Sequence, residues 1–308
     1  MNKARQLRSL IEAPEILVMP GIFDGFSARL SEASGFAAGF LTGSGISESS
    51  LGWADQGIMG LEENLRVTRA IAACCGLPLL ADADTGYGNA INVHFSVRAF
   101  ERAGVCGVMI EDQVWPKRCG HMKGKEVISA EEGAAKIRAA AEARVNPELV
   151  IMSRTDTLAT HGIEEVIRRL NMYADAGADL LFCDAVMKVE EIKAIAKGVS
   201  KPFCVNMGFG IRRRSTTPLL SPKNLQDLGV SVVIYPRMLT SAAIQGMKHA
   251  IAAIKQSMHT GEVVDRPDLL VSFEELNDLV GIKELERLEQ RYLLPDHYDR
   301  KYAGSSGH

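Results

Sequence analysis

The feature that most constrains this chain is a repeat, in which short apolar runs alternate with longer helical patterns from one end to the other. Eight runs occur, at Ile16–Met19, Ala37–Thr42, Pro78–Asp82, Gly107–Glu111, Leu149–Arg154, Leu180–Asp184, Pro202–Asn206 and Val230–Tyr235. Continuous apolar runs of this length predict strands buried on both faces, as in a parallel sheet covered by helices. Eight such units favour a closed (β/α)8 barrel of the TIM type, in the α/β class; an open doubly wound sheet is the alternative.

The chain continues beyond the last predicted strand. Helical patterns cover residues 238–258 and 273–294, whereas a barrel needs only one helix after its eighth strand. We therefore expect one barrel domain over residues 1–302 with a C-terminal helical extension. The hypothesis for its extra helices is exchange between subunits as swapped elements. The polar, glycine-rich residues 303–308 are expected to be a disordered tail or an expression remnant.

Composition and charge limit the partners of the chain. Its net charge is −3, and its one dense basic run is Arg212 to Arg214, so a nucleic-acid partner is not expected. Apolar stretches fall short of the roughly 18 residues of a membrane span, and the N-terminus lacks the apolar core of a signal peptide. The six cysteines form no CxxC pair, so we expect a reducing, cytoplasmic location.

Charged and amide side chains gather at the ends of the predicted strands. In a barrel of this type, chemistry takes place at the carboxyl ends of the strands, which meet at one mouth. The residues at or just beyond these ends are Thr42, Gly43 and Ser44 for the second strand, Asp82 and Asp84 for the third, Glu111 for the fourth, Arg154 for the fifth, Asp184 for the sixth and Asn206 for the seventh. We expect them to form one site.

The acids of the third and fourth strands predict a metal site. Asp82 and Asp84 share one face of an extended segment, and Glu111 ends the neighbouring strand. Three facing carboxylates repel one another unless a cation lies between them. Hard cations prefer carboxylate oxygen, so we expect Mg²⁺, with Mn²⁺ as a substitute. The alternative is that one or two of these acids only cap a following helix.

Arg154 and the glycines after the second strand are candidate carboxylate binders. An arginine fork donates two parallel hydrogen bonds to a carboxylate. The alternative is a structural ion pair of Arg154 with Asp184 or Glu111, and the two roles can coexist. Closely spaced backbone amides at Gly43 to Gly45 can form a second anion-binding concavity.

A polar loop after the fourth strand contains Lys117, Arg118, Cys119, Gly120 and His121. Neighbouring cations favour the thiolate form of a cysteine, which suits a proton donor, a proton acceptor or a nucleophile. A loop cysteine can also be a bystander, but its basic flanks and its place above the expected metal site favour a catalytic role.

Four segments resemble one family in order and spacing. DADTGYGN at 82–89, IEDQ at 110–113, KRCGH at 117–121 and SRTD at 153–156 are similar to motifs of the isocitrate lyase/phosphoenolpyruvate mutase superfamily. The similarity runs from about Pro20 to Tyr235. It implies a metal-dependent enzyme acting on a small 2-hydroxy or 2-oxo acid, assembled as a homotetramer that is a dimer of dimers.

The resemblance also implies roles for individual residues. Asp84 would contact Mg²⁺ most directly, while Asp55, Asp82 and Glu111 would hold its waters. Cys119 would donate a proton, with Arg154, Lys117 and His121 as further catalytic groups. The substrate would be bound by Thr42, Gly43, Ser44, Gly120, Arg154, Asp184 and Asn206.

The KRCGH segment is typical of the carbon–carbon bond lyases of this superfamily. The leading hypothesis is therefore retro-Claisen cleavage of a malate-like acid, of the 2,3-dimethylmalate or 2-methylisocitrate type, to pyruvate and a carboxylic acid. Asp184 stands where 2-methylisocitrate lyases have glutamate, and Thr157 where oxaloacetate hydrolases have serine. The alternatives are oxaloacetate hydrolysis to oxalate and acetate, phosphonate chemistry of the mutase type, which Cys119 disfavours, and a non-catalytic binder.

Overall fold

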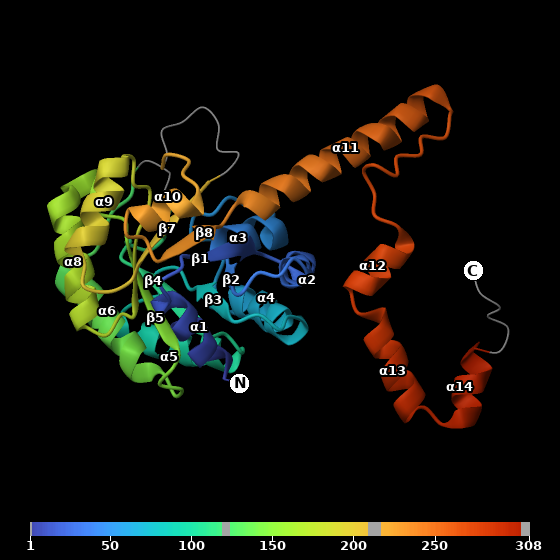
Figure 1. Ribbon diagram of the computed structural model, residues 1–308, viewed down its shortest axis with the longest axis horizontal. Coiled ribbons are helices and arrows are strands. Elements are labelled where there is room, and N and C mark those ends of the chain that lie inside the picture. The colour runs from blue at the N-terminus through green and yellow to red at the C-terminus, as the bar shows by residue number, and fades with distance from the viewer. Residues whose placement is uncertain (1, 119–123, 209–216, 303–308) are drawn as a thin grey trace. The chain divides into compact units, whose positions relative to one another are not determined.

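The computed structural model describes residues 2–118, 124–208 and 217–302, and it confirms the closed barrel (Figure 1). Eight parallel strands close in chain order, so the open sheet is excluded. They are β1 (Leu17–Ile22), β2 (Gly39–Leu41), β3 (Leu79–Asp82), β4 (Gly107–Glu111), β5 (Val150–Thr155), β6 (Leu180–Cys183), β7 (Phe203–Asn206) and β8 (Val232–Tyr235).

Helices surround the barrel and close one of its ends. Those of the barrel unit are α1 (Lys3–Glu12), α2 (Gly25–Ala33), α3 (Gly43–Leu51), α4 (Leu61–Cys74), α5 (Ala90–Arg102), α6 (Ala130–Ala143), α7 (Leu158–His161), α8 (Ile163–Asp175), α9 (Val189–Gly198) and α10 (Pro222–Asp227). Leu7 and Ile11 of α1 join the apolar cluster inside the barrel. Because α1 covers the amino-terminal end, the opposite end is left for a site.

Two apolar layers explain why the strands read as continuous apolar runs. One face of each strand packs inside the barrel, where Met19, Leu80, Met152 and Phe182 lie together. The other face packs against the surrounding helices in a second, larger cluster. Strands buried on both faces have no polar side to alternate with.

The cysteines of the described segments belong mainly to these layers. Cys75, Cys106, Cys183 and Cys204 are buried, Cys74 is half-buried, and none of the five forms a disulfide. As expected, four of them pack as small apolar side chains.

The chain divides into two compact units, residues 1–244 and 245–308. The second contains most of α11 (Met238–Thr260), then α12 (Phe273–Leu279), α13 (Ile282–Tyr292) and α14 (Pro295–Tyr302). The expected helix over 273–294 is broken, because Gly281 has a φ of 84°, in the left-handed region. The extra C-terminal helices are present, and one domain over residues 1–302 stays a prediction.

In the described segments, no helix combines the length and the apolar character needed to cross a lipid bilayer.

A close contact between two helices beside the mouth gives a test of this packing. A Cβ on Gly133 of α6 would lie 2.3 Å from the hydroxyl of the buried Tyr173 on α8. We expect Gly133→Ala to destabilise the barrel by about 1–3 kcal/mol, because this hydroxyl must move away from its hydrogen bond to Asp112. Thermal unfolding measures this. Gly25→Ala is the matched control, since its Cβ would meet its nearest atom at 3.8 Å. Equal midpoints for both variants would contradict the packing.

Candidate active site

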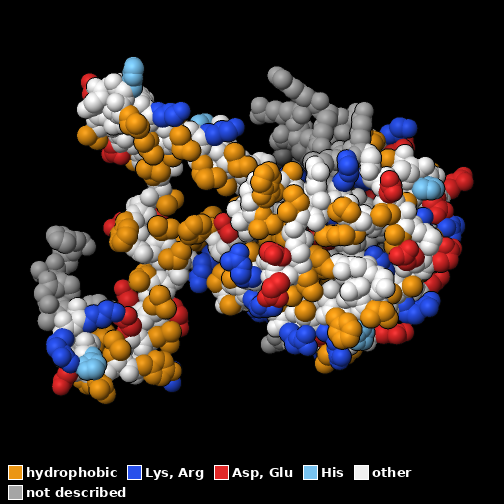
Figure 2. Space-filling view, turned by 180° about the vertical axis from the view of Figure 1, so that it is seen from behind, with side chains coloured by type: hydrophobic (Ala, Val, Ile, Leu, Met, Phe, Trp, Pro, Cys, Tyr) orange, Lys and Arg blue, Asp and Glu red, His pale blue; other side chains and the backbone are white. Residues whose placement is uncertain are grey.

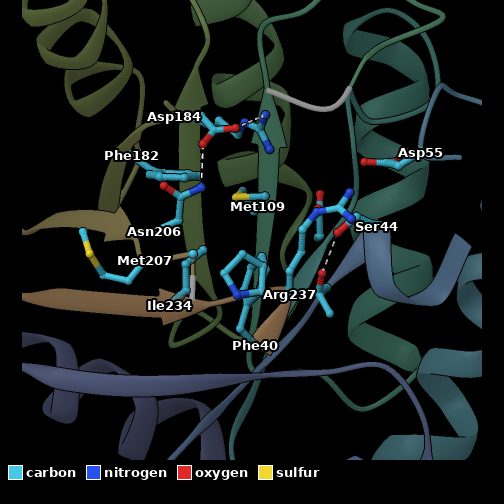
Figure 3. A pocket seen from close by; sticks show the side chains of 15 residues that line it. Phe40, Ser44, Asp55, Met109, Phe182, Asp184, Asn206, Met207, Ile234 and Arg237 are labelled. Atoms are coloured by element: carbon cyan, nitrogen blue, oxygen red, sulfur yellow. Dashed lines mark hydrogen bonds and ion pairs between the residues drawn. The ribbon is translucent and has the colours of Figure 1, made fainter. Parts of the chain in front are cut away.

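A pocket opens at the carboxyl ends of the strands, where the sequence predicts the site (Figure 3). Phe40, Met109, Phe182 and Ile234 supply its apolar lining. The polar lining comes from the ends of six strands and the loops that follow them, and consists of Thr42, Ser44, Asp55, Asp82, Arg154, Asp184, Asn206 and Arg237. All of these except Arg237 are among the site residues expected from the sequence.

Arg154 lies at the centre of this group and is almost fully buried. Its Nε and Nη2 donate to the two carboxylate oxygens of Asp156, at 2.8 and 3.1 Å. Nη2 also lies 2.6 Å from Asp184 Oδ2, and Nε lies 3.1 Å from Glu111 Oε2. The ion pairs with Asp184 and Glu111 that the sequence allowed are therefore present, and they orient a guanidinium that lines the pocket.

Asp156 fixes the position of Arg154 and is itself paired with Lys125. Sequence reasoning assigned no role to either residue. Lys125 Nζ lies 2.9 Å from Asp156 Oδ1, and both side chains are nearly inaccessible to solvent. Burial acts to raise the pKa of Asp156, but Arg154 and Lys125 outweigh it and hold that pKa below its ordinary value. Asp156 could have been found from the sequence, because it shares a strand face with Arg154.

Asp112 supports the end of β5 from the helix side. Its carboxylate accepts hydrogen bonds from the Thr155 hydroxyl at 2.7 Å, the Asp156 amide at 3.0 Å and the Tyr173 hydroxyl at 2.9 Å. Arg169 Nη1 balances its charge at 3.1 Å. Asp112 thus fixes the backbone that carries Arg154 and Asp156.

The opposite side of the mouth is acidic. Asp55, Asp82, Asp84 and Glu111 are all buried. Lys117 Nζ inserts between two of them, 2.5 Å from Asp55 Oδ1 and 2.8 Å from Asp84 Oδ1. Among the described residues, neither carboxylate oxygen of Glu111 has a hydrogen-bond partner, although one forms the ion pair with Arg154.

Burial raises the pKa values of these acids, because the charged form of a carboxyl is unfavourable away from water. It raises the pKa of Asp84 to about 7, although Lys117 counteracts it, and the pKa of Glu111 well above its ordinary value. The pKa of Asp82 is raised for the same reason. Lys117 and Arg154 therefore offset only part of the cost of burying these carboxyl groups.

The donor set fits a hard divalent cation. Within the described ranges, no three His, Cys, Asp or Glu side chains lie close enough to ligate one ion together. Mg²⁺ keeps several waters and often takes only one or two carboxylates directly, so a close three-residue cluster is not required. The Glu111 oxygens, which accept no hydrogen bond from the described residues, and the raised pKa of Asp84 suit such an ion. The Lys117 ammonium occupies the position between Asp55 and Asp84 with a positive charge of its own.

The end of β2 brings backbone amides to the same pocket. Thr42 caps α3, since its hydroxyl accepts a hydrogen bond from the Gly45 amide at 3.3 Å and lies 3.0 Å from the Ser44 hydroxyl. A Cβ on Gly43 would lie 2.9 Å from Asp82 Oδ2, so only glycine allows this close approach. Anion binding by these amides stays a prediction.

Some expected residues lie outside the described segments. These are Cys119, Gly120 and His121, together with the basic run Arg212 to Arg214.

Comparison with known proteins then identifies the family. Residues 7–255 match the family described as phosphoenolpyruvate phosphomutase. The chain belongs to this family. Members of the superfamily use a divalent metal ion.

Three relatives differ in their named activities. The chain is 40% identical to 2,3-dimethylmalate lyase of Eubacterium barkeri, covering 95% of this chain and 99% of that one. It is 38% identical to the chloroplastic carboxyvinyl-carboxyphosphonate phosphorylmutase of Arabidopsis thaliana, covering 92% and 83%. A solved oxaloacetate acetylhydrolase with 3,3-difluorooxalacetate has a TM-score of 0.86 at 31% identity, covering 94% and 96%. Lyases, mutases and hydrolases therefore share this architecture.

Replacing Asp156 tests whether its carboxylate stabilises the buried Arg154 and Lys125 side chains. We expect Asp156→Asn to destabilise the barrel by about 3–5 kcal/mol, because it leaves two buried cations without their shared carboxylate. Glu62→Gln is the control, since it removes an exposed ion pair with Arg69 and should cost less than about 1 kcal/mol. Denaturant unfolding compares the two. Similar losses in both variants would contradict the role of Asp156.

The raised pKa of Asp84 predicts how metal affinity depends on pH. Below about pH 7 this carboxyl is largely protonated, and it must lose its proton to bind a cation. We therefore expect Mg²⁺ affinity to fall with decreasing pH, by up to about tenfold per unit below 7. Calorimetry in two buffers of different ionisation enthalpy measures both the affinity and the proton released. An affinity that is constant across this range, with no proton release, would contradict the assignment.

Proposed function

We propose that this protein is a Mg²⁺-dependent carbon–carbon bond lyase that cleaves a malate-like 2-hydroxy di- or tricarboxylate. The products would be pyruvate and a second carboxylic acid. The observation that carries this proposal is one pocket lined both by the oriented Arg154 guanidinium and by the buried acids Asp55 and Asp82. Arg154 suits a substrate carboxylate, and the acids suit a metal. The 40% identity to a 2,3-dimethylmalate lyase supports the substrate class.

Each side of the pocket has a separate task in this proposal. Asp84 would hold the metal most directly, with Asp55, Asp82 and Glu111 placed to hold its waters. The bound metal would supply a Lewis acid for the oxygen on C2 of the substrate. Arg154 would bind the carboxylate on C2, and the other residues proposed to orient this end are Thr42, Gly43, Ser44, Asp184 and Asn206.

The bond-breaking step follows from the substrate's chemistry. A base takes the proton of the 2-hydroxyl, the C2–C3 bond breaks, and its electron pair moves to C3. The carboxylate on C3 delocalises that pair, and Cys119 then protonates C3 so that the acid can leave. Lys117, Gly120 and His121 would assist at this end, as the resemblance implies.

Oxaloacetate hydrolysis is the second candidate. The structure removes one argument against it, because Thr157 is buried and is not among the residues that line the pocket. Its hydroxyl lies 3.1 Å from His161 Nδ1 instead. Exchange of threonine for serine there would not change the pocket lining directly, so Thr157 discriminates poorly between lyase and hydrolase. Phosphonate chemistry is less favoured, because the sequence contains Cys119.

A tetrameric assembly belongs to the proposal as well. The exposed side chains Ile244, Met247, Ile251, Ile254 and Met258 recur at intervals of three and four along α11, as in a helix that packs against another. The barrel unit has its own exposed apolar hollow, lined in part by Leu30, Phe36 and Met238. A second copy of the chain is the proposed partner for these surfaces, through exchanged helices. We also propose a reducing, cytoplasmic location, since none of the five cysteines in the described segments forms a disulfide.

A coupled assay for pyruvate, with Mg²⁺ present, tests the activity on 2,3-dimethylmalate, 2-methylisocitrate and oxaloacetate in parallel. Pyruvate from either of the first two establishes the lyase and identifies its substrate. Oxalate from oxaloacetate, with no pyruvate from the other two acids, establishes the hydrolase instead.

Cys119→Ser tests the proton donor. We expect cleavage to fall by about 10²–10⁴-fold, because a serine hydroxyl is a much weaker acid at this step. Binding of Mg²⁺ and of oxalate should stay within about threefold of the unmodified protein, since neither is assigned to Cys119. Steady-state kinetics and calorimetry give the two quantities. Full turnover in Cys119→Ser would refute the proton-donor role.

A further inference from the structure

Arg237 is a second guanidinium in the pocket, and sequence reasoning did not single it out. It follows the end of β8 by two residues and lines the same pocket as Arg154. In Figure 3 its side chain lies beside Ser44, on the side away from Asp184 and Asn206. Arg154 is bound to Asp184 at 2.6 Å, so the two guanidinium groups belong to different sides of the pocket.

The position of Arg237 is fixed by its backbone and by an ion pair. A Cβ on Gly21 of β1 would lie 2.5 Å from the Pro236 carbonyl oxygen, so β1 packs tightly against the residue before Arg237. The Arg237 guanidinium lies against Glu48 of α3, with Nη1 at 3.0 Å from Oε2 and Nη2 at 2.8 Å from Oε1. A bidentate pair of this kind sets the plane of the guanidinium.

The local charge explains why a second cation is useful here. A malate-like substrate has one carboxylate on C2 and another on C3. The lining acids Asp55, Asp82 and Asp184 are unfavourable neighbours for a second negative charge. That charge grows when the C2–C3 bond breaks, because the bonding pair is delocalised into the carboxylate on C3. A preoriented cation at that end would stabilise the charge where it develops.

We propose that Arg237 binds the carboxylate of the leaving fragment and stabilises its charge during cleavage. This inference rests on the proposed lyase function and deepens it, since it makes a second carboxylate on C3 a requirement for good substrates. The proton of the 2-hydroxyl passes to a base, the electron pair of the C2–C3 bond passes to C3, and C3 then takes a proton. Arg237 takes no part in proton transfer or in breaking the C2–C3 bond; it only binds the carboxylate on C3.

The competing explanation is structural, because Arg237 also ties the end of β8 to α3 through Glu48. Both side chains of the pair are partly exposed, at 23% and 31%, so the pair alone should contribute little stability. Glu48→Gln removes the pair and keeps the cation, whereas Arg237→Gln removes both. Comparing these two variants separates charge recognition from the structural tie.

The experiment measures kcat/KM for 2,3-dimethylmalate and the affinities for 2,3-dimethylmalate and oxalate, with Mg²⁺ present. For Arg237→Gln we expect kcat/KM to fall by about 10²–10³-fold and 2,3-dimethylmalate affinity to weaken, with oxalate affinity within about threefold. Arg237→Lys should recover part of the loss, and Glu48→Gln should stay within about tenfold of the unmodified protein.

Several results would overturn this assignment: equal losses in Arg237→Gln and Glu48→Gln, an unchanged kcat/KM in Arg237→Gln, or a parallel loss of oxalate affinity. The lyase proposal fails separately. If the unmodified protein cleaves none of the acids, but Arg237→Gln selectively weakens its 2,3-dimethylmalate binding, Arg237 keeps its binding role and the lyase assignment falls.

Discussion

The ion pairs around Arg154 are the interaction on which the rest of the site depends. In the barrel register, Glu111 of β4 lies opposite Arg154 of β5, and Arg154 lies opposite Phe182 of β6. A guanidinium placed there is far from bulk water, so it needs carboxylates, and Glu111, Asp156 and Asp184 supply them. The fold therefore presents to the pocket a cation whose orientation is set before any ligand arrives.

The acidic side of the mouth lies opposite the Arg154 ion pairs and has the charge opposite to that of the guanidinium. Asp82, Asp84 and Glu111 have raised pKa values because burial is only partly offset by Lys117 and Arg154. A barrel stabilised only for folding would gain by replacing some of these acids, since buried carboxyl groups are costly. The cation proposed to bind there, with the chemistry that such a cation supports, would account for their concentration at one mouth.

Much of this architecture could be predicted from the sequence because its signals are local. The apolar runs gave the eight strands, and the rule that chemistry lies at strand ends brought Asp82, Arg154, Asp184 and Asn206 together. Lys125 and Arg237 were missed for a physical reason. Each acquires its place through a partner distant in the chain, Asp156 for Lys125 and Glu48 for Arg237, and no local pattern reports such a contact. The break at Gly281 was overlooked because the flanking segments share one helical periodicity.

The most direct test of the account is the position of a bound cation. A crystal grown with Mn²⁺, which can replace Mg²⁺ and scatters anomalously, would locate it. The account predicts a single strong peak beside the Asp84 carboxylate, with the Lys117 ammonium displaced from between Asp55 and Asp84. A protein that binds no Mn²⁺ at this mouth, with Lys117 still paired to both acids, would contradict it.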